Sequence, residues 1–583
     1  MTYYLQLRQL LTPGVLALAS LTAKIINGRT YYYARDCQRV NGKPKIVRTT
    51  YLGTAADLIA AATHHQAQLA PQPQAVEIAA FGDVVALYDL AQQIGLVELL
   101  DRHLPKRDQG LSVGHYLLLA AINRAVQPTS KTQLADWYHQ TALPRLLPAT
   151  AAQLSSQAFW NHFDLVEEHQ IAAAERELSQ RLVELFHLSL RTLTYDGTNF
   201  FTFIDTRTPA ELPQRGHNKQ KRNDLRQVSL GMLVSTDFHV PLFHKVYAGN
   251  VPDSTVFQTI TEELRVRYCE LARDCEHITL VFDKGNNSEE AFVTLDQTAF
   301  HVIGSLVPSH HADLLDVPAH RYQPLPGERL QDVRAYRTTK EVFGQERTIV
   351  VTHNDNLLQG QLQGLMAALE KARGKLRDLQ TKLRRRREGR TRGGKAPTAA
   401  SIRKQAQEAL TGQHVKTVLR VEVEDGTVPT LRFATDQTAL ARLVDKQLGK
   451  TILFTDNEDW TNEEIVLGYR SQSHIEDAFR QMKHPHYLGW QPMFHWTDSK
   501  IRVHAFTCVL ALMLSSLLQR ALHQKDLDLS LPRIFDLLGG IRETLVIYPK
   551  KPGQRHPTMV HALSALSAEQ EQLVSALALR RYQ

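Results

Sequence analysis

The chain has 583 residues, too many for a single hydrophobic core, so its length indicates several domains. Hydrophobic residues make up 43% and charged residues 22%, which is ordinary for soluble globular proteins and excludes a chain that is disordered throughout. The net charge of +8 is unevenly spread, because residues 371–420 carry 16 Lys and Arg against 3 Asp and Glu. That segment predicts a surface that binds a polyanion, although a basic tip that is merely solvated would show the same pattern.

The cysteines and the apolar runs exclude further classes of protein. Cys37, Cys269, Cys275 and Cys508 form no paired motif, so neither a zinc site nor a disulfide framework is expected. The N-terminal residues lack the pattern of a signal peptide. The longest apolar run, at residues 504–518, is too short to span a membrane and predicts a buried helix instead.

The composition and element patterns divide the chain into consecutive segments. We expect an N-terminal β-hairpin region at 1–65, a linker at 66–83, a helical segment that could bind DNA at 84–189, the first part of an α/β core at 190–307, an insertion at 308–458 with strands and a helical hairpin at 357–411, the second part of the core at 459–523, and a helical C-terminal tail at 524–583.

Two N-terminal patterns allow both a DNA-binding and a structural interpretation. Residues 28–53 predict a β-hairpin turning at Asn41-Gly42, and its basic residues and tyrosines could hold a DNA backbone or simply be solvated. Residues 116–125 and a second helix ending at Tyr138 flank a turn. This arrangement is compatible with a helix–turn–helix, and equally with an ordinary packed pair of helices.

Residues 190–306 alternate in the order β-β-β-α-β-α-β, which predicts a three-layered mixed sheet with crossover helices. One strand is expected to end at Asp196, another at Asp283, and a helix is expected at residues 253–273. Chemistry in such sheets gathers outside the ends of central strands. A lone aspartate at a strand end is usually a turn former, but two in one sheet indicate a site.

Residues 461–483 predict a single helix that begins with a capping box of Thr461 and Glu464. Polar residues recur along one stripe of this helix, at helical spacing. They are Tyr469, Gln472, Glu476, Arg480 and Lys483. A solvated face with pairs of opposite charge would explain the same stripe.

Asp196, Asp283 and Glu476 together predict a cluster of three carboxylates. Three such groups repel one another unless a divalent cation offsets their charge. Oxygen ligands suit Mg²⁺ or Mn²⁺ rather than zinc, and two such ions can promote phosphodiester displacement. Lys483, two turns beyond Glu476, could then hold a phosphate oxygen.

Within the insertion, apolar residues recur at alternating four- and three-residue spacing from Leu358 to Leu383, which predicts a coiled coil. The seam runs into four consecutive arginines, and a second helix can fold back on the first. The arginines are Arg384, Arg385, Arg386 and Arg387. The spacing does not decide between pairing within the chain and dimerisation.

Four stretches together resemble the DDE transposases of bacterial insertion sequences, and among them the insertion-sequence-four superfamily. They are YDGTNFF around Asp196, YAGNVPDSTVF around Asp253, VFDKGNNS around Asp283, and the helix of Tyr469, Glu476 and Lys483. In that superfamily a β-rich insertion separates the second acid from the third. The resemblance covers residues 190–520 specifically and the N-terminal part more loosely.

The resemblance implies an RNase H-like catalytic core, a mixed sheet flanked by helices. It implies two Mg²⁺ ions (or Mn²⁺) held by three catalytic, metal-binding acids, Asp196, Asp283 and Glu476. It also implies that Tyr469 and Lys483 contact the DNA of the transposon end.

We expect further DNA contacts at Arg470, Gln472 and Arg480, and at the basic tip, Arg384 to Arg387. The family pattern has an arginine where this chain has Gln472, and Arg470 stands one residue after the tyrosine.

The expected function is that of a DNA transposase, an enzyme that cleaves insertion-sequence ends and joins the 3′-hydroxyl to target DNA. The alternatives are an RNase H-like metal-dependent nuclease without strand transfer and a catalytically inactive DNA-binding protein. Its partners would be the terminal inverted repeats, target DNA and, because two ends are processed together, a second copy of the chain on DNA. No membrane partner is expected, and the expected location is the prokaryotic cytoplasm, in association with the nucleoid.

Overall fold

The computed structural model describes most of the chain in two compact units. The described residues are 18–40, 43–68, 72–105, 110–205, 207–218, 220–252, 255, 260–261, 263–264, 278–283, 289–296, 300–391, 393–550 and 557–583. One unit comprises Met1–Glu77 with Thr544–Ala562, and the other comprises Ile78–Glu543 with Leu563–Gln583.

The smaller unit is built on an antiparallel sheet in the order β1-β2-β3. Its elements are β1 (Leu18–Ile26), β2 (Arg29–Val40), β3 (Lys43–Gly53) and helix α2 (Ala55–Gln68). The predicted hairpin is therefore confirmed as β2 and β3, with β1 as an additional strand, while its turn at residues 41–42 lies outside the described residues. Tyr31, Tyr33 and Tyr51 pack together on one face, and the Lys24 ammonium lies 5.5 Å from the ring centroid of Tyr33.

Helices form the first part of the larger unit, as the sequence pattern predicts. They are α3 (Gly82–Ile94), α4 (Leu96–His103), α5 (Val113–Val126), α6 (Leu134–His139), α7 (Leu143–Leu146), α8 (Ser156–Phe163) and α9 (Glu168–Phe186). Most of α5 is buried, and α6 has only six residues, three of them buried. A recognition helix needs an exposed face to enter a groove, so this pair is better described as a packing unit.

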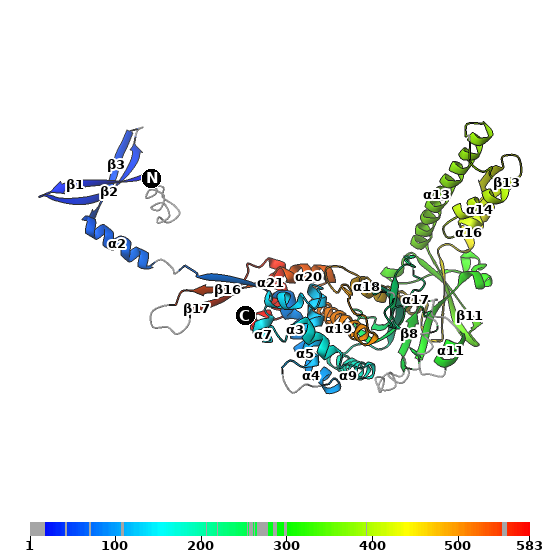
Figure 1. Ribbon diagram of the computed structural model, residues 1–583, viewed down its shortest axis with the longest axis horizontal. Coiled ribbons are helices and arrows are strands. Elements are labelled where there is room, and N and C mark those ends of the chain that lie inside the picture. Colours follow the sequence, from blue (N-terminus) through cyan, green and yellow to red (C-terminus); the bar gives the residue numbers. More distant parts are fainter. Residues whose placement is uncertain are drawn as a thin grey trace. The chain divides into compact units, whose positions relative to one another are not determined.

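A nine-stranded mixed sheet follows, in the order β10-β11-β12-β15-β9-β8-β5-β6-β7. Its strands β8 and β11 are labelled in Figure 1. Its first strands in the chain are β5 (Thr192–Thr202), β6 (Arg226–Ser235), β7 (Pro241–Ala248), β8 (Ile278–Phe282) and β9 (Phe300–Leu306), with α11 (Glu289–Leu295) between the last two. Strands β5, β6 and β7 are antiparallel neighbours, whereas β8 runs parallel to both β5 and β9. The predicted mixed sheet is thus confirmed, and the helix predicted at 253–273 falls largely outside the described residues.

Four strands of the insertion extend this same sheet. They are β10 (Gln323–Pro324), β11 (Val333–Val342), β12 (Gln345–Asn354) and β15 (Lys450–Thr455), and β15 pairs with both β12 and β9. Short helices η3 (Pro308–His310), α12 (Ala312–Leu315) and η4 (Ala319–Arg321) connect β9 to β10, and η5 (Glu328–Leu330) connects β10 to β11.

The apolar seam of the insertion is buried within the chain. It lies on α13 (Asp355–Arg387), and it packs against α14 (Ala399–Ala409) and the ribbon of β13 (Leu419–Glu424) and β14 (Thr430–Thr435) (Figure 1). Helices α15 (Val415–Val418) and α16 (Gln437–Lys446) complete this part. Pairing within the chain therefore accounts for the heptad spacing without a second copy.

The last part contains α17 (Asn462–Arg470), α18 (Gln472–Met482), α19 (Asp498–His523), α20 (Leu531–Gly539), β16 (Arg542–Tyr548), β17 (Thr558–Leu563), α21 (Ala568–Ala576) and η6 (Leu579–Tyr582). The prediction of a helical tail is wrong in part, because β16 pairs with β17 and with β4 (Ala75–Ala80). Helix α19 is long and apolar enough to cross a membrane by composition, but it is almost entirely buried in the core, as predicted.

Candidate active site

Asp196 lies within strand β5 rather than at its end, which corrects the sequence-based prediction. The strand continues to Thr202 because residues 197–202 keep pairing with β6. Side chains alternate between the two faces of a strand, so Thr194, Asp196 and Thr198 share one face. Asp196 is partly exposed there, and its Oδ1 accepts a hydrogen bond from the backbone N–H of Gly197 (2.8 Å).

Asp283 directly follows β8, as predicted, and its side chain is exposed. Strands β5 and β8 are parallel, with Tyr195 opposite Phe282. Asp196 follows Tyr195, and Asp283 follows Phe282. The register of the two strands therefore places these two acids side by side. Neighbouring strands are about 4.8 Å apart, which brings both carboxylates to one edge of the same face.

The predicted single helix at 461–483 is in fact two helices, α17 and α18, which meet at Ser471. The capping box is confirmed, because the Thr461 hydroxyl accepts from the backbone N–H of Glu464 (3.2 Å) and the Glu464 carboxylate accepts from that of Thr461 (2.9 Å). At the break, the Ser471 hydroxyl donates to the carbonyl of Gly468 (2.6 Å). Gly468 and Ser471 lie in the same turn, and a glycine together with a serine whose hydroxyl bonds back to the helix backbone commonly interrupts a helix.

Helix α18 lies over the face of β5 that carries Asp196. At its start, the hydroxyls of Ser471 and Thr194 are 3.2 Å apart, and beyond its end the Lys483 ammonium donates to the Thr198 hydroxyl (2.6 Å). These two contacts flank Asp196 on the strand and Glu476 on the helix. Glu476 is exposed. The three acids therefore belong to one region, between β5, β8 and α18.

Tyr469 connects this region to strand β9. Its phenol donates a hydrogen bond to the Ser305 hydroxyl (2.8 Å). Burial raises the pKa of Tyr469, and the nearby carboxylates of Asp283 and Glu476 raise it further, while the Ser305 hydrogen bond opposes them. Both acids thus act electrostatically on the same phenol, which agrees with their placement in one region.

The donor set is suited to a hard divalent cation, since it consists of carboxylate oxygens on a partly solvated surface. Within the described ranges, however, no three Asp, Glu, His or Cys side chains gather closely enough to hold one ion. The structure brings the three acids to one face of the sheet and does not gather them at a single point.

Comparison with known families identifies this architecture. A family model described as the transposase DDE domain matches residues 201–514, which is more than half of the chain. The chain belongs to the transposase DDE domain family. The matched range includes Asp283 and Glu476 and begins five residues after Asp196.

Solved structures of transposases were found with low similarity. The piggyBac transposase synaptic complex with hairpin DNA has 8% sequence identity and a TM-score of 0.35, covering 80% of this chain and 82% of that one. The Mos1 transposase paired-end complex with the left transposon end has 14% identity and a TM-score of 0.14, covering 30% and 59%. No curated protein matches the transposase.

The other residues predicted to bind DNA on α17 and α18 and just beyond differ in their contacts within the chain. Arg470 donates to the carbonyl of Arg329 (2.9 Å), and Arg480 pairs with Asp477. Gln472 is half-buried, and its amide nitrogen has no hydrogen-bond partner in the described part of the chain. Lys483 reaches Thr198 and lies 5.3 Å from the ring centroid of Phe200.

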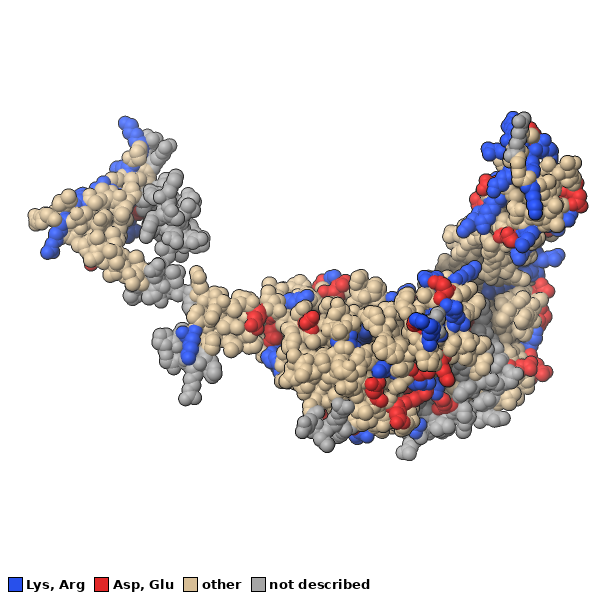
Figure 2. Space-filling model, in the orientation of Figure 1, with Lys and Arg blue, Asp and Glu red and all other residues tan. Residues whose placement is uncertain are grey.

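The four arginines at the tip also divide into two pairs. Arg386 donates to the carbonyls of Gly393 and Gly394, and Arg387 donates to the Thr430 hydroxyl (2.7 Å), so both brace the tip. Arg384 and Arg385 are exposed. Lys and Arg gather over this end of α13 in the space-filling view (Figure 2).

Two residues beside the acids were not predicted from the sequence. They are Thr194, which contacts Ser471, and Thr198, which accepts from Lys483. Their only signal in the sequence is their two-residue spacing from Asp196.

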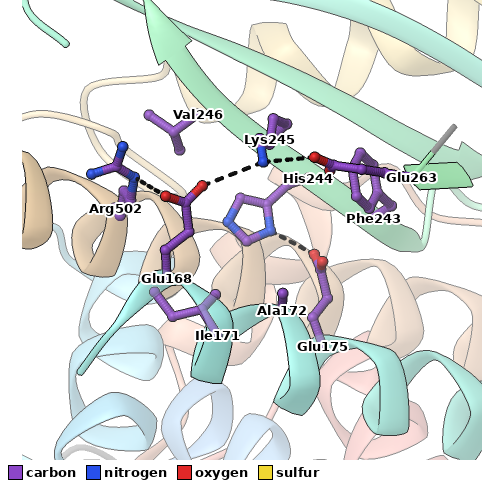
Figure 3. Close-up of a pocket in the computed structure, with 10 residues that line it drawn as sticks. All are labelled: Glu168, Ile171, Ala172, Glu175, Phe243, His244, Lys245, Val246, Glu263 and Arg502. Atoms are coloured by element: carbon purple, nitrogen blue, oxygen red, sulfur yellow. Dashed lines mark hydrogen bonds and ion pairs between the residues drawn. The ribbon is translucent and has the colours of Figure 1, made fainter. Parts of the chain in front are cut away.

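A small cavity of about 60 Å³ lies elsewhere in the transposase, between α9, β7 and α19. Figure 3 shows Glu168 between Arg502 and Lys245, and Glu175 directed at His244. The Glu168 carboxylate is 3.0 Å from Arg502 and 3.4 Å from Lys245, and that of Glu175 is 2.5 Å from His244 Nδ1. Because these polar side chains are paired with one another, the cavity is a joint between the helices and the sheet edge.

Replacing Glu175 with alanine is expected to lower the free energy of unfolding by about 2–4 kcal/mol, because His244 would remain buried without its partner. Thermal or urea unfolding measures the change. The matched control is Glu168→Ala, whose carboxylate is 47% exposed and whose loss should cost under about 1 kcal/mol. Equal effects of the two substitutions would contradict this assignment.

Proposed function

We propose that this transposase cleaves the ends of its insertion sequence and joins the released 3′-hydroxyl to target DNA by two-metal phosphodiester chemistry. One observation carries the proposal: Asp196 and Asp283 are neighbours on adjacent parallel strands, and the helix that carries Glu476 lies over the same face. We infer that β5 to β9, with α18, form the RNase H-like core that the family resemblance implies.

In this proposal Asp196, Asp283 and Glu476 hold two Mg²⁺ or Mn²⁺ ions. Such ions, when bound, supply activation of the attacking oxygen and stabilisation of the leaving oxygen. Lys483, held beside Asp196 by Thr198, would exchange that hydroxyl for a phosphate oxygen of the DNA end, as a point charge. Tyr469 positions α17 on β9 and is proposed to contact the end DNA from there.

Strand cleavage tests the proposal directly. The purified protein is incubated with labelled DNA that spans its own element's end, with Mg²⁺ or with EDTA, beside Asp196→Ala. We expect metal-dependent cuts at the element boundary that are absent in the variant, followed by joining to target DNA. Cuts without joining would favour an RNase H-like nuclease, and tight binding without cuts would favour a DNA-binding protein. Copies bound together on two ends would show the expected dimer.

Neutralising the exposed pair at the tip, with Arg384→Ala and Arg385→Ala, is expected to weaken DNA binding and to reduce the slope of log affinity against log salt by about 2. Electrophoretic or anisotropy titrations across salt concentrations measure the slope. The matched control replaces Arg176 and Arg181, two exposed arginines of α9, and should leave the slope unchanged. An unchanged slope in the tip variant would indicate that Arg384 and Arg385 are ordinary solvated charges that do not contact DNA phosphates.

A further inference from the structure

The connection between β5 and β6 has a fixed internal frame, although it lies at the protein surface. Gln214 and Gln227 exchange two backbone hydrogen bonds (3.0 and 2.8 Å). The fully buried Gln227 amide donates to the carbonyls of His217 (3.1 Å) and Gly249 (2.7 Å). A buried glutamine therefore holds this connection against the end of β7.

A second buried amide shapes the loop from within. The Asn218 side chain accepts from the backbone N–H of Arg222 (2.8 Å) and donates to the carbonyl of Gly216 (3.2 Å). A Cβ on Gly216 would lie 2.1 Å from the carbonyl oxygen of Gly249, so no side chain fits there. The backbone of the loop is pressed directly against the end of the sheet.

The loop is also tied to the core helix α19. The Asp498 carboxylate, in the first turn of that helix, accepts from the backbone N–H groups of Glu211 (2.9 Å) and Leu212 (3.0 Å). A surface connection that only joined two strands would need none of these hydrogen bonds to buried side chains and to a core helix, so its shape is preorganised.

The side chains that this frame presents outward are basic. Residues 212–218 and 220–226, here named the basic loop, contain four Lys and Arg and one acid, Asp224. Arg222 pairs with Asp224 through two 2.8 Å hydrogen bonds. Arg215, His217 and Lys221 are exposed. The charge and the rigid backbone fit a polyanion of regular geometry.

We propose that the basic loop is a preformed phosphate-binding site for duplex DNA, set at a fixed distance from the catalytic acids. Gln227, at the base of the loop, pairs with Phe201, five residues along β5 from Asp196. At about 3.3 Å per residue this distance is roughly 17 Å, which is about five base pairs at 3.4 Å each. A duplex that follows β5 from the scissile phosphate meets the loop there. The inference rests on the proposed function, because it takes Asp196 as the reacting end.

Binding to duplexes of increasing length tests the proposal. The full chain is titrated in EDTA, without cleavage, against element-end duplexes extended on either side of the cut by about 3 to 12 base pairs. We expect the affinity of the wild type to rise once the extension on one side reaches about five base pairs. The double variant Arg215→Ala, Lys221→Ala should lose that step, roughly tenfold in affinity, and bind shorter duplexes as the wild type does.

Two further variants separate charge and shape from general effects. The α9 pair Arg176→Ala, Arg181→Ala should keep the step. Asn218→Ala keeps every charge but removes the frame, and it should weaken the step while the protein remains folded by thermal unfolding. A step that persists without Arg215 and Lys221, or an equal loss at every length, would overturn the proposal, and a step unaffected by Asn218→Ala would overturn its preformed character.

The proposed function and the proposed role of the basic loop are contradicted by different results. Absence of metal-dependent cleavage by the wild type would contradict the proposed function, yet the length step in EDTA would remain. Normal cleavage with no step attributable to Arg215 and Lys221 would contradict the basic loop alone.

Discussion

Replacing Glu476 with glutamine is expected to reduce metal-dependent strand cleavage by roughly a thousandfold or more, while DNA binding stays within a few-fold of the wild type. Glutamine keeps the size and the helix propensity of the residue, but it removes the negative charge that would hold a divalent ion. Because Glu476 is exposed on α18, the change should not disturb the core. Cleavage and binding are measured on the same labelled element end.

The neighbouring acid of the same helix provides a matched control. Asp477 pairs with Arg480 on the surface of α18, so Asp477→Asn changes the same charge one residue away. We expect this variant to cleave within a few-fold of the wild type. If both variants lost activity equally, the net charge of the helix would be responsible, and if Glu476→Gln lost DNA binding as well, the residue would be structural.

Replacing Lys131 with methionine is expected to stabilise the transposase near pH 7. Lys131 is only 6% exposed, and its ammonium has no hydrogen-bond partner within the described part of the chain. It lies 5.5 Å from the ring centroid of Phe159. Burial, together with Arg124, lowers the pKa of Lys131 from 10.5 to about 7. That shift corresponds to a penalty of up to about 5 kcal/mol when the unfolded chain is protonated.

The groups around Lys131 are basic or neutral. Arg124 of α5 donates to the carbonyls of Thr129 and Pro492 (both 3.0 Å). Burial and neighbouring cations, Lys500 among them, lower the pKa of His495 well below 6.5, and burial with the same cluster does so for His504. Burial raises the pKa of the Cys508 thiol to about 11. Burial at this joint between α5 and α19 thus favours the neutral forms: Lys131, His495 and His504 lose their protons more readily, and Cys508 keeps its own.

The stability of the transposase should therefore rise with pH. Between about pH 7 and 10.5 the unfolded chain binds a proton at Lys131 that the folded protein does not, so raising the pH from 7 to 9 should add about 2 kcal/mol. Below pH 6.5 the two histidines add a loss in the same direction, since only the unfolded chain protonates them readily.

Apparent melting temperatures from about pH 5.5 to pH 9 measure this dependence. Lys131→Met should melt higher than the wild type at pH 7 and show a flatter rise toward pH 9. The control Lys245→Met should melt lower than the wild type, because Lys245 pairs with Glu168 and Glu263. It should keep the pH dependence of the wild type, because the pKa of Lys245 is raised above 10.5 and the group stays charged over this whole range. A Lys131 variant that melts lower at every pH would show that the cation is stabilised by its surroundings.

Local signals in the sequence predicted several elements well, because their causes are local. The capping box at Thr461 needs only two residues three positions apart, and the seam from Leu358 to Leu383 needs only helical spacing. The break between α17 and α18 at Ser471 was not predicted. The Ser471 hydroxyl also contacts that of Thr194, which is 277 residues away in the chain, and no local pattern encodes such a contact.

The candidate site could be predicted in its residues but not in its arrangement. Alternating strand and helix patterns pointed to Asp196 and Asp283, and the structure makes them neighbours through the register of β5 and β8. That register is set by long-range pairing, which no local spacing encodes. For the same reason, Asp196 was placed at a strand end although pairing with β6 carries the strand six residues farther.

The helical hairpin leaves the sheet and returns to it at one place. His353 and Lys450 are partners on β12 and β15, and the backbone N–H of Asn354 donates to the carbonyl of Gly449 (2.8 Å). The two ends of the excursion are thus one hydrogen bond apart, as the ends of a tight turn would be. A chain with a short turn in its place could form the same sheet. We therefore expect that this excursion could be removed or exchanged without altering the register that aligns the acids.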